Sequence, residues 1–248
     1  MVANWKMHPG SAAEARLLFG QLKRFGSKLD SVETVICPPH PYIGLLSHSG
    51  TTRVFLGAQN AYLSNSGRAT GEVSPEMLKD LGVSHVIVGH SERRAMGESD
   101  EVVAKKTLAV IKEGMKAILC IGERERDPDG RYFGFLRDQL RNSLSGIQRR
   151  FLSELIVAYE PIFAIGKSAR DALTPRDVNE MSIFIRKVLS DLYDPEVAGT
   201  VPILYGAAVE EENTAALFLE GGVSGLLVGH KSLDVEAFTK MLKLANSI

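Results

Sequence analysis

The chain contains the stretch His85-Val86-Ile87-Val88-Gly89-His90, a short apolar run that ends in a glycine and a polar residue. A second stretch, Leu155-Ile156-Val157-Ala158-Tyr159-Glu160, ends in the same way. A β-strand that is buried on both faces reads as such a run, which is typical of parallel sheets covered by helices. Eight runs of this kind occur along the chain, at 1–6, 34–37, 53–59, 85–90, 116–122, 155–160, 202–206 and 225–229.

Helical patterns alternate with these runs. Ser11 is placed to cap a first helix, and further patterns lie near 41–49, 75–82, 99–114, 131–149, 175–193, 211–220 and 234–246. Such alternation favours an α/β fold with right-handed crossovers, in a closed barrel or a long open sheet. No Gly-x-Gly-x-x-Gly follows the first run, so a dinucleotide-binding open sheet loses its main support. We therefore predict a single (β/α)8 barrel domain over residues 1–248.

The composition limits the classes of partner and the cellular location. The formal net charge is -1 and 24% of the residues are charged, which argues against nucleic acid or an anionic membrane as a bulk partner. Cys37 and Cys120 lie in apolar runs, as buried free thiols do, and this favours a reducing compartment over a disulfide framework. The sequence shows no N-terminal leader and no apolar stretch of roughly 18 residues. We expect a cytoplasmic protein that binds neither membrane nor nucleic acid.

His90 is a candidate for chemistry because active sites of α/β barrels lie at the C-terminal ends of the strands. It is followed by Ser91 and Glu92, which look like the start of a helical turn. The N-terminus of a helix disfavours positive charge, so a nearby imidazole stays neutral and can donate to a developing oxyanion. The alternative is a histidine that is hydrogen-bonded for structural reasons.

Glu160 ends its run and is followed by Pro161, so its carboxylate should project from the end of the strand. In a site that closes against water, a carboxylate becomes a stronger base. The alternative is an ion pair with an arginine such as Arg93. Both arrangements could occur in different states of the neighbouring loop.

Lys6 ends the first run with a cation that points to the same end of the barrel. A lysine in that position is often only a solvated charge. Beside a neutral histidine and a glutamate, however, it becomes a plausible partner for a negatively charged substrate.

The last two runs end in Gly206 and Gly229, which are followed by Ala207-Ala208 and by His230. In barrels, the loops after strands seven and eight commonly bind phosphate through backbone N–H groups. Small residues also make tight turns between strands and helices, so the position favours phosphate binding more than the residue types do.

Two stretches have little periodicity. Residues 60–73 are rich in Ser, Asn and Gly, and they predict an active-site lid, an interaction loop or a tolerated surface insertion. Residues 161–173 directly follow Glu160, which makes them the better lid.

The motifs that carry these candidates occur in a fixed order. They are Asn4-Trp5-Lys6-Met7, Gly71-Glu72-Val73-Ser74-Pro75, Gly89-His90-Ser91-Glu92-Arg93-Arg94, Gly97-Glu98-Ser99-Asp100, Cys120-Ile121-Gly122-Glu123, Ala158-Tyr159-Glu160-Pro161 and Ala164-Ile165-Gly166. In sequence and order they resemble the motifs of the triosephosphate isomerase family. The resemblance implies a TIM barrel that interconverts dihydroxyacetone phosphate and glyceraldehyde 3-phosphate in glycolysis and gluconeogenesis, with no metal and no organic cofactor.

The resemblance also implies roles for the candidate residues. Glu160 would move a proton between two carbons, His90 would stabilise the enediolate oxygen, and Lys6 would add electrostatic stabilisation. Residues 161–171 would close over the site, since an enediolate phosphate exposed to water can lose its phosphate group. The other implied substrate-binding and supporting residues are Asn4, Glu92, Gly166, Ala208, Gly229 and His230.

The stretch 60–73 is similar to the family's interdigitating loop, in which Thr70 would reach the active site of a neighbouring subunit. The resemblance therefore implies a homodimer.

The chain departs from the family pattern mainly in the loops. Phe163 stands where tryptophan is usual, residues 167–171 replace a common Thr-Gly-Lys, Ala207-Ala208 replace Gly-Ser, and His230 replaces a second glycine. The missing serine hydroxyl removes one donor to a phosphate, worth roughly 1.5–3 kcal/mol, or about ten- to hundredfold in affinity.

These departures motivate a second hypothesis, a catalytically impaired barrel that persists as a dimeric binding or scaffold protein. A third reading is another sugar-phosphate isomerase or an aldolase. An aldolase would need a Schiff-base lysine in the barrel, and the runs offer only Lys6 and, at the opposite end of its strand, Lys116.

Overall fold

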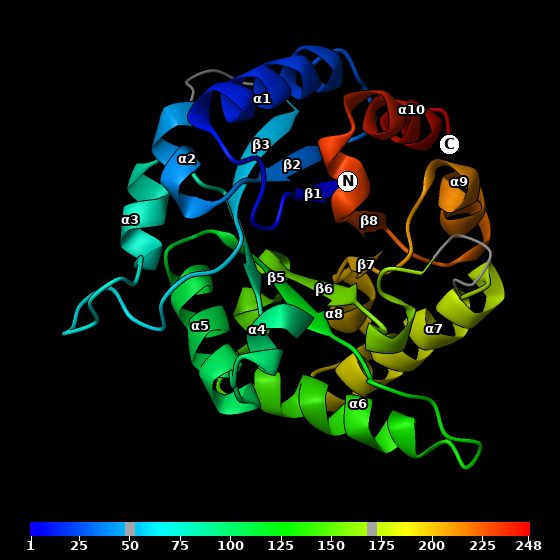
Figure 1. Ribbon diagram of the computed structural model, residues 1–248. Helices are drawn as coiled ribbons and strands as arrows, with labels where there is room; N and C mark the ends of the chain where they lie inside the picture. Colours follow the sequence, from blue (N-terminus) through cyan, green and yellow to red (C-terminus); the bar gives the residue numbers. More distant parts are fainter. Residues whose placement is uncertain (48–52, 168–172) are drawn as a thin grey trace.

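The apolar runs form the strands of a barrel in the computed structural model, which describes residues 1–47, 53–167 and 173–248. Each strand pairs in parallel with the next one along the chain, and β8 pairs with β1 to close the barrel (Figure 1). The strands are β1 Val2–Asn4, β2 Thr34–Cys37, β3 Val54–Ala58, β4 His85–Val88, β5 Lys116–Ile121, β6 Leu155–Tyr159, β7 Ile203–Tyr205 and β8 Gly225–Val228. The predicted (β/α)8 barrel is confirmed, and the open sheet is excluded.

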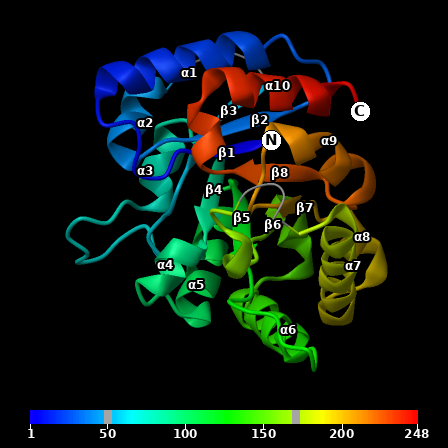
Figure 2. The ribbon, with the colours of Figure 1, turned by 45° about the vertical axis from the view of Figure 1, so that its right-hand side comes forward.

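The helices surround this barrel, as the two views in Figures 1 and 2 show. They are α1 Ala12–Gly26, α2 His40–Leu46, α3 Pro75–Asp80, α4 Ser91–Ala95, α5 Asp100–Lys112, α6 Arg131–Ser143, α7 Pro175–Leu192, α8 Pro195–Thr200, α9 Glu211–Glu220 and α10 Val235–Asn246, with 3-10 turns η1 Arg149–Glu154, η2 Ile162–Ala164 and η3 His230–Leu233. Ser11 caps α1 as predicted, since its side chain accepts a hydrogen bond from the Glu14 N–H. Among the helices in the described part of the chain, none is both long and apolar enough to cross a membrane.

Several helix boundaries differ from the prediction. The pattern over 131–149 ends at Ser143, because the chain turns at 144–146 before η1. The short helix α8 was missed, although Asp194 and Pro195 carry its signal: the Asp194 carboxylate accepts from the Val197 N–H, and proline occupies the first turn. Helix α4 is separated from α5 at Gly97, whose φ of 101° suits glycine.

The core has two layers. Val35, Cys37, Ile118 and Ala158 belong to a small apolar cluster of alternate strand residues, and the other alternate residues pack in the larger cluster with the helices. Both cysteines are free and buried, as expected. Burial raises the pKa of the Cys37 thiol, so it stays protonated. Asn4, His90 and Glu160 are buried polar residues that lie at or just after the C-terminal ends of these apolar strands.

Candidate active site

The predicted residues Asn4, Lys6, His90 and Glu160 come together at the mouth of the barrel, by which we mean the C-terminal ends of the strands and the loops that follow them. Asn4 ends β1, and His90 and Glu160 follow β4 and β6. Asn4, His90 and Glu160 are buried, whereas Lys6 is partly exposed. Parallel strands of one barrel present their C-terminal ends on the same side, which explains how residues so distant in sequence meet.

Lys6 has a φ of 51°, a left-handed conformation that is uncommon for a residue with a side chain. Local hydrogen bonds hold it: the Lys6 N–H donates to Asn4 Oδ1 at 3.0 Å, and Gln59 Nε2 donates to the Lys6 carbonyl at 2.8 Å. Between Asn4 and Lys6, the indole of Trp5 is fully buried. These hydrogen bonds from neighbouring residues fix the backbone conformation of Lys6.

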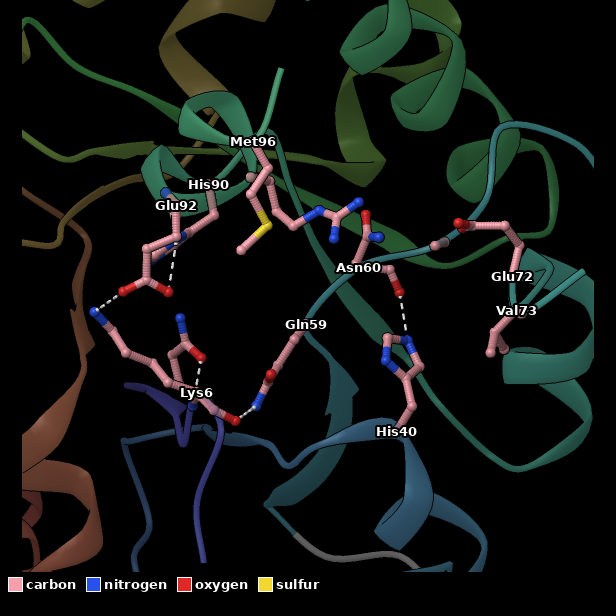
Figure 3. A pocket seen from close by; sticks show the side chains of 13 residues that line it. Lys6, His40, Gln59, Asn60, Glu72, Val73, His90, Glu92 and Met96 are labelled. Atoms are coloured by element: carbon pink, nitrogen blue, oxygen red, sulfur yellow. Dashed lines mark hydrogen bonds and ion pairs between the residues drawn. The ribbon is translucent and has the colours of Figure 1, made fainter. Parts of the chain in front are cut away.

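The ammonium group of Lys6 lies 2.6 Å from Glu92 Oε1, and Figure 3 shows the two side chains pointing toward one another. Burial alone raises the pKa of Glu92, but the hydrogen bond from Lys6 and the charge of Lys6 bring it below the ordinary value. The Lys6 ammonium is therefore held in an ion pair with Glu92 and is not simply surrounded by solvent.

The hydrogen bonds around His90 determine which ring nitrogen carries a proton. The Glu92 N–H, in the first turn of α4, donates to His90 Nδ1 at 3.2 Å. A nitrogen that accepts a hydrogen bond carries no proton, so the proton of the neutral imidazole lies on Nε2. Nε2 lies 3.3 Å from Glu160 Oε1. The predicted helical turn after His90 is confirmed, and the ring presents an N–H to the mouth.

Glu160 is held at its backbone by the segment that follows β5. Its N–H donates to the Ile121 carbonyl at 2.7 Å. A Cβ on Gly122 would lie 1.9 Å from the Glu160 carbonyl oxygen, so only glycine allows this approach. The carboxylate also accepts from the Ser91 N–H at 3.5 Å. Arg93, the alternative partner considered for Glu160, donates instead to Glu98 Oε1 at 2.7 Å.

A buried ionic group under α4 was missed by the sequence prediction. Lys106 Nζ donates to Glu98 Oε1 at 2.5 Å and to Asn60 Oδ1 at 2.9 Å, and Glu98 also accepts from Arg93. Burial raises the pKa of Glu98, but the bonds from Lys106 and Arg93 outweigh it and lower the pKa. The signal was a lysine on the apolar face of the predicted helix, between Val103 and Val110.

The predicted phosphate residues line one cavity of about 330 Å³. It brings together Gly166 from the loop after β6, Ala208 from the loop after β7, and Gly229 with His230 from the loop after β8. Lys6 lines this cavity and also a second one of about 310 Å³, which Asn4, His90 and Glu92 share. We call the part of the mouth around His90 and Glu160 the acid–base end, and the 330 Å³ cavity the phosphate end. Lys6 lies between the two.

Thr70 lines neither of these two cavities. Thr70 is exposed on the loop between β3 and α3, which projects from the barrel (Figure 1). Of the predicted closing loop 161–171, residues 168–171 lie outside the described residues. Over the described ranges, no group of three or more His, Cys, Asp and Glu side chains is placed to hold a metal ion.

Residues 1–245 match the family model described as triosephosphate isomerase. The chain belongs to the triosephosphate isomerase family. It is 41% identical to the triosephosphate isomerase of Thermus thermophilus, over 99% of this chain and 98% of that protein. The triosephosphate isomerase of Natranaerobius thermophilus is 38% identical, over 99% and 95% of the two chains. That of Symbiobacterium thermophilum is 40% identical, over 99% and 96%. The resemblance read from the motifs is confirmed over nearly the whole chain.

Proposed function

We propose that the chain interconverts dihydroxyacetone phosphate and glyceraldehyde 3-phosphate by moving a proton between adjacent carbons through an enediolate. Membership in the triosephosphate isomerase family supports this activity. The observation that carries it is the placement of two buried groups of opposite function: Glu160 Oε1, which accepts, and His90 Nε2, which donates, at 3.3 Å.

Each group then has one task in the reaction. The Glu160 carboxylate takes a proton from one substrate carbon and returns it to the next, while His90 Nε2–H donates to the oxygen that gains negative charge. The hydroxyl proton on the first carbon's oxygen passes to the oxygen of the second carbon, which completes the interconversion. A substrate oxygen that accepts this N–H replaces the carboxylate at His90 and leaves Glu160 beside the carbons. Lys6, directed by Glu92, stabilises the added charge, and Asn4 orients the substrate.

The phosphate group would occupy the cavity shared by Gly166, Ala208, Gly229 and His230. Backbone N–H groups of the loops are donors at the glycine and alanine positions, and the ammonium groups of Lys6, Lys167 and Lys231 line the same cavity. The imidazole N–H of His230 adds one side-chain donor on the same wall. Closure of residues 161–171 would keep water from the enediolate and so prevent loss of phosphate.

A coupled isomerisation assay on the wild type beside Glu160→Gln tests this function. We expect the variant to lose about 10²–10⁴-fold in kcat, because it lacks the base. Wild-type turnover no greater than that of Glu160→Gln would refute the proposal and favour an impaired barrel. Product analysis with other sugar phosphates separates the isomerase from related activities.

We further propose a homodimer and a cytoplasmic location. Met7 and Met96 are 90% and 77% exposed, and Met96 lines the 310 Å³ cavity beside Lys6 and Glu92 (Figure 3). Such exposed apolar side chains around a cavity mark an interaction surface, and the projecting loop with Thr70 supplies a matching element. Sedimentation of the full chain at micromolar concentration should give twice the chain mass. A single-chain mass would contradict the dimer.

A further inference from the structure

A partly buried arginine, Arg126, lies in the loop between β5 and α6 and contacts Tyr159, the residue before Glu160. Arg126 Nε donates to Glu123 Oε1 at 3.0 Å, and its NH2 group donates to the Tyr159 hydroxyl at 3.0 Å. The Tyr159 hydroxyl in turn donates to Glu123 Oε1 at 2.8 Å. Glu123 and Tyr159 are each 1% exposed, whereas the Arg126 side chain is 22% exposed, so a partly exposed guanidinium caps two buried polar groups.

The same guanidinium also covers two aromatic rings. Its Cζ lies 5.1 Å from the ring centroid of Tyr132 and 5.6 Å from that of Phe163. Both distances fall within the range of cation–π attraction. Phe163 belongs to η2, at the start of the loop after β6. Arg126 therefore contacts a residue on each side of Glu160: Tyr159 directly before it and Phe163 three positions after it.

Backbone hydrogen bonds join the same two segments. The Glu160 N–H donates to the Ile121 carbonyl at 2.7 Å, and the Ile162 N–H donates to the Glu123 carbonyl at 2.8 Å. These bonds hold only the main chain. Arg126 and the bond from the Tyr159 hydroxyl to Glu123 supply the side-chain part of the connection between residues 121–126 and 159–163.

The buried Glu123 carboxylate takes its hydrogen bonds from Arg126 and Tyr159. Its Oε2 is buried without a hydrogen-bond partner among the described residues, so its charge is met through Oε1, by Arg126 and Tyr159. Burial and the Glu123 carboxylate raise the pKa of Tyr159, which keeps the phenol protonated and able to donate. Removing Arg126 would leave a buried carboxylate with a single neutral donor.

We propose that Arg126 is a positioning residue for the base: it holds residues 159–163 in place, so that the Glu160 carboxylate moves on a stationary backbone. This inference rests on the proposed isomerase function. A lysine could not replace the arginine, because one ammonium group cannot bond Glu123 and Tyr159 with the fork geometry while covering both rings.

The test compares kcat, KM and melting temperature for the wild type, Arg126→Met, Arg126→Lys and the double variant Glu123→Gln/Arg126→Met. Arg126→Met keeps the aliphatic stem, and we expect kcat to fall about ten- to hundredfold through misplacement of the base, with KM within about twofold. Its melting temperature should also fall. The double variant no longer buries an uncompensated charge, so it should regain melting temperature while kcat stays low.

Arg126→Lys keeps the charge and provides a folded variant if Arg126→Met does not fold. It should lose about threefold or more in kcat, since the two bonds to Glu123 and Tyr159 require the guanidinium fork. Arg131→Met is the matched control. The Arg131 side chain is 79% exposed, and its ion-pair partners within the described residues are Asp127 and Asp129. We expect wild-type kinetics for it.

Three results would overturn the inference. Recovery of kcat together with melting temperature in the double variant would show that Arg126 only stabilises the fold. Wild-type kcat in both single variants would show that Glu160 does not depend on it. A wild type without turnover would refute the proposed function itself, and this inference with it, so the two failures are distinguishable.

Discussion

The two ends of the barrel mouth are built in different ways. At the acid–base end, side chains contact side chains at short distances, with Lys6 2.6 Å from Glu92 and His90 3.3 Å from Glu160. At the phosphate end, the small residues Gly166, Ala207, Ala208 and Gly229 line the cavity together with longer side chains that include Lys6, Lys167 and Lys231. Chemistry that needs particular functional groups leaves a recognisable sequence, whereas binding through backbone N–H groups accepts many small residues. The departures Ala207, Ala208 and His230 from the family pattern all fall at the phosphate end.

The largest expected effect concerns the ionic group that supports the acid–base end. Glu98 and Lys106 have side chains only 9% and 4% exposed. Glu98→Gln leaves the Lys106 ammonium without its carboxylate and should lower the free energy of unfolding by about 3–5 kcal/mol. Chemical denaturation at neutral pH measures the loss. An equal loss for Glu210→Gln, whose carboxylate lies 3.9 Å from Lys231 at the phosphate end, would erase the contrast between the two ends.

Glu98 also predicts a pH dependence. Its pKa is lowered in the folded protein, so its contribution to stability is complete above the ordinary carboxyl pKa and is lost as the pH falls through the folded value. The wild type should therefore lose stability below about pH 4 more steeply than Glu98→Gln. Parallel stability curves for the two proteins in acid would contradict the lowered pKa.

The next largest effect, on kcat, is expected at His90. His90→Leu removes the Nε2–H donor at similar size, and kcat should fall about 10²–10³-fold, or roughly 2.7–4 kcal/mol. His90→Gln retains an N–H donor and should lose less. Steady-state kinetics at saturating substrate measure kcat for both variants. An equal loss of kcat in the two would mean that the N–H donor at this position does not contribute to catalysis.

The smallest effect is at the phosphate end. Ala208→Ser adds a hydroxyl to the wall of the 330 Å³ cavity and should lower KM by up to about tenfold, with kcat nearly unchanged. Turnover of glyceraldehyde, which has no phosphate, is the matched control and should not change. If KM for the phosphorylated substrate stays the same, the backbone donors and His230 already suffice.

The sequence predicted parallel strands because they are nearly continuous apolar runs, and the lack of a Gly-x-Gly-x-x-Gly after the first run favoured a closed barrel over an open sheet. It also predicted His90 and Glu160, because each ends such a run. The predicted C-terminal boundary of the helix over 131–149 was wrong, because the helix ends at Ser143. Leu144 and Ile147 are buried after that end, so the apolar spacing continues past it.

Other features depend on contacts between distant segments, which one sequence does not display. Arg126 looked like one charge among several in a polar loop, and only the fold places it against Tyr159 and Phe163. The ion pair of Lys106 with Glu98 and the proton position on His90 are of the same kind. Each follows from partners that the topology brings close, not from local pattern.

The position of Trp5 gives the protein a built-in optical probe. It is the one tryptophan in the sequence, it follows Asn4 and precedes Lys6 along the chain, and its buried indole packs in the larger apolar cluster. Intrinsic fluorescence therefore comes from a single place, beside the acid–base end, and is not an average over the molecule. Changes in emission on adding an inhibitor or denaturant would report events at that spot without any attached dye, so ligand titration and local loosening can be followed in the unmodified chain.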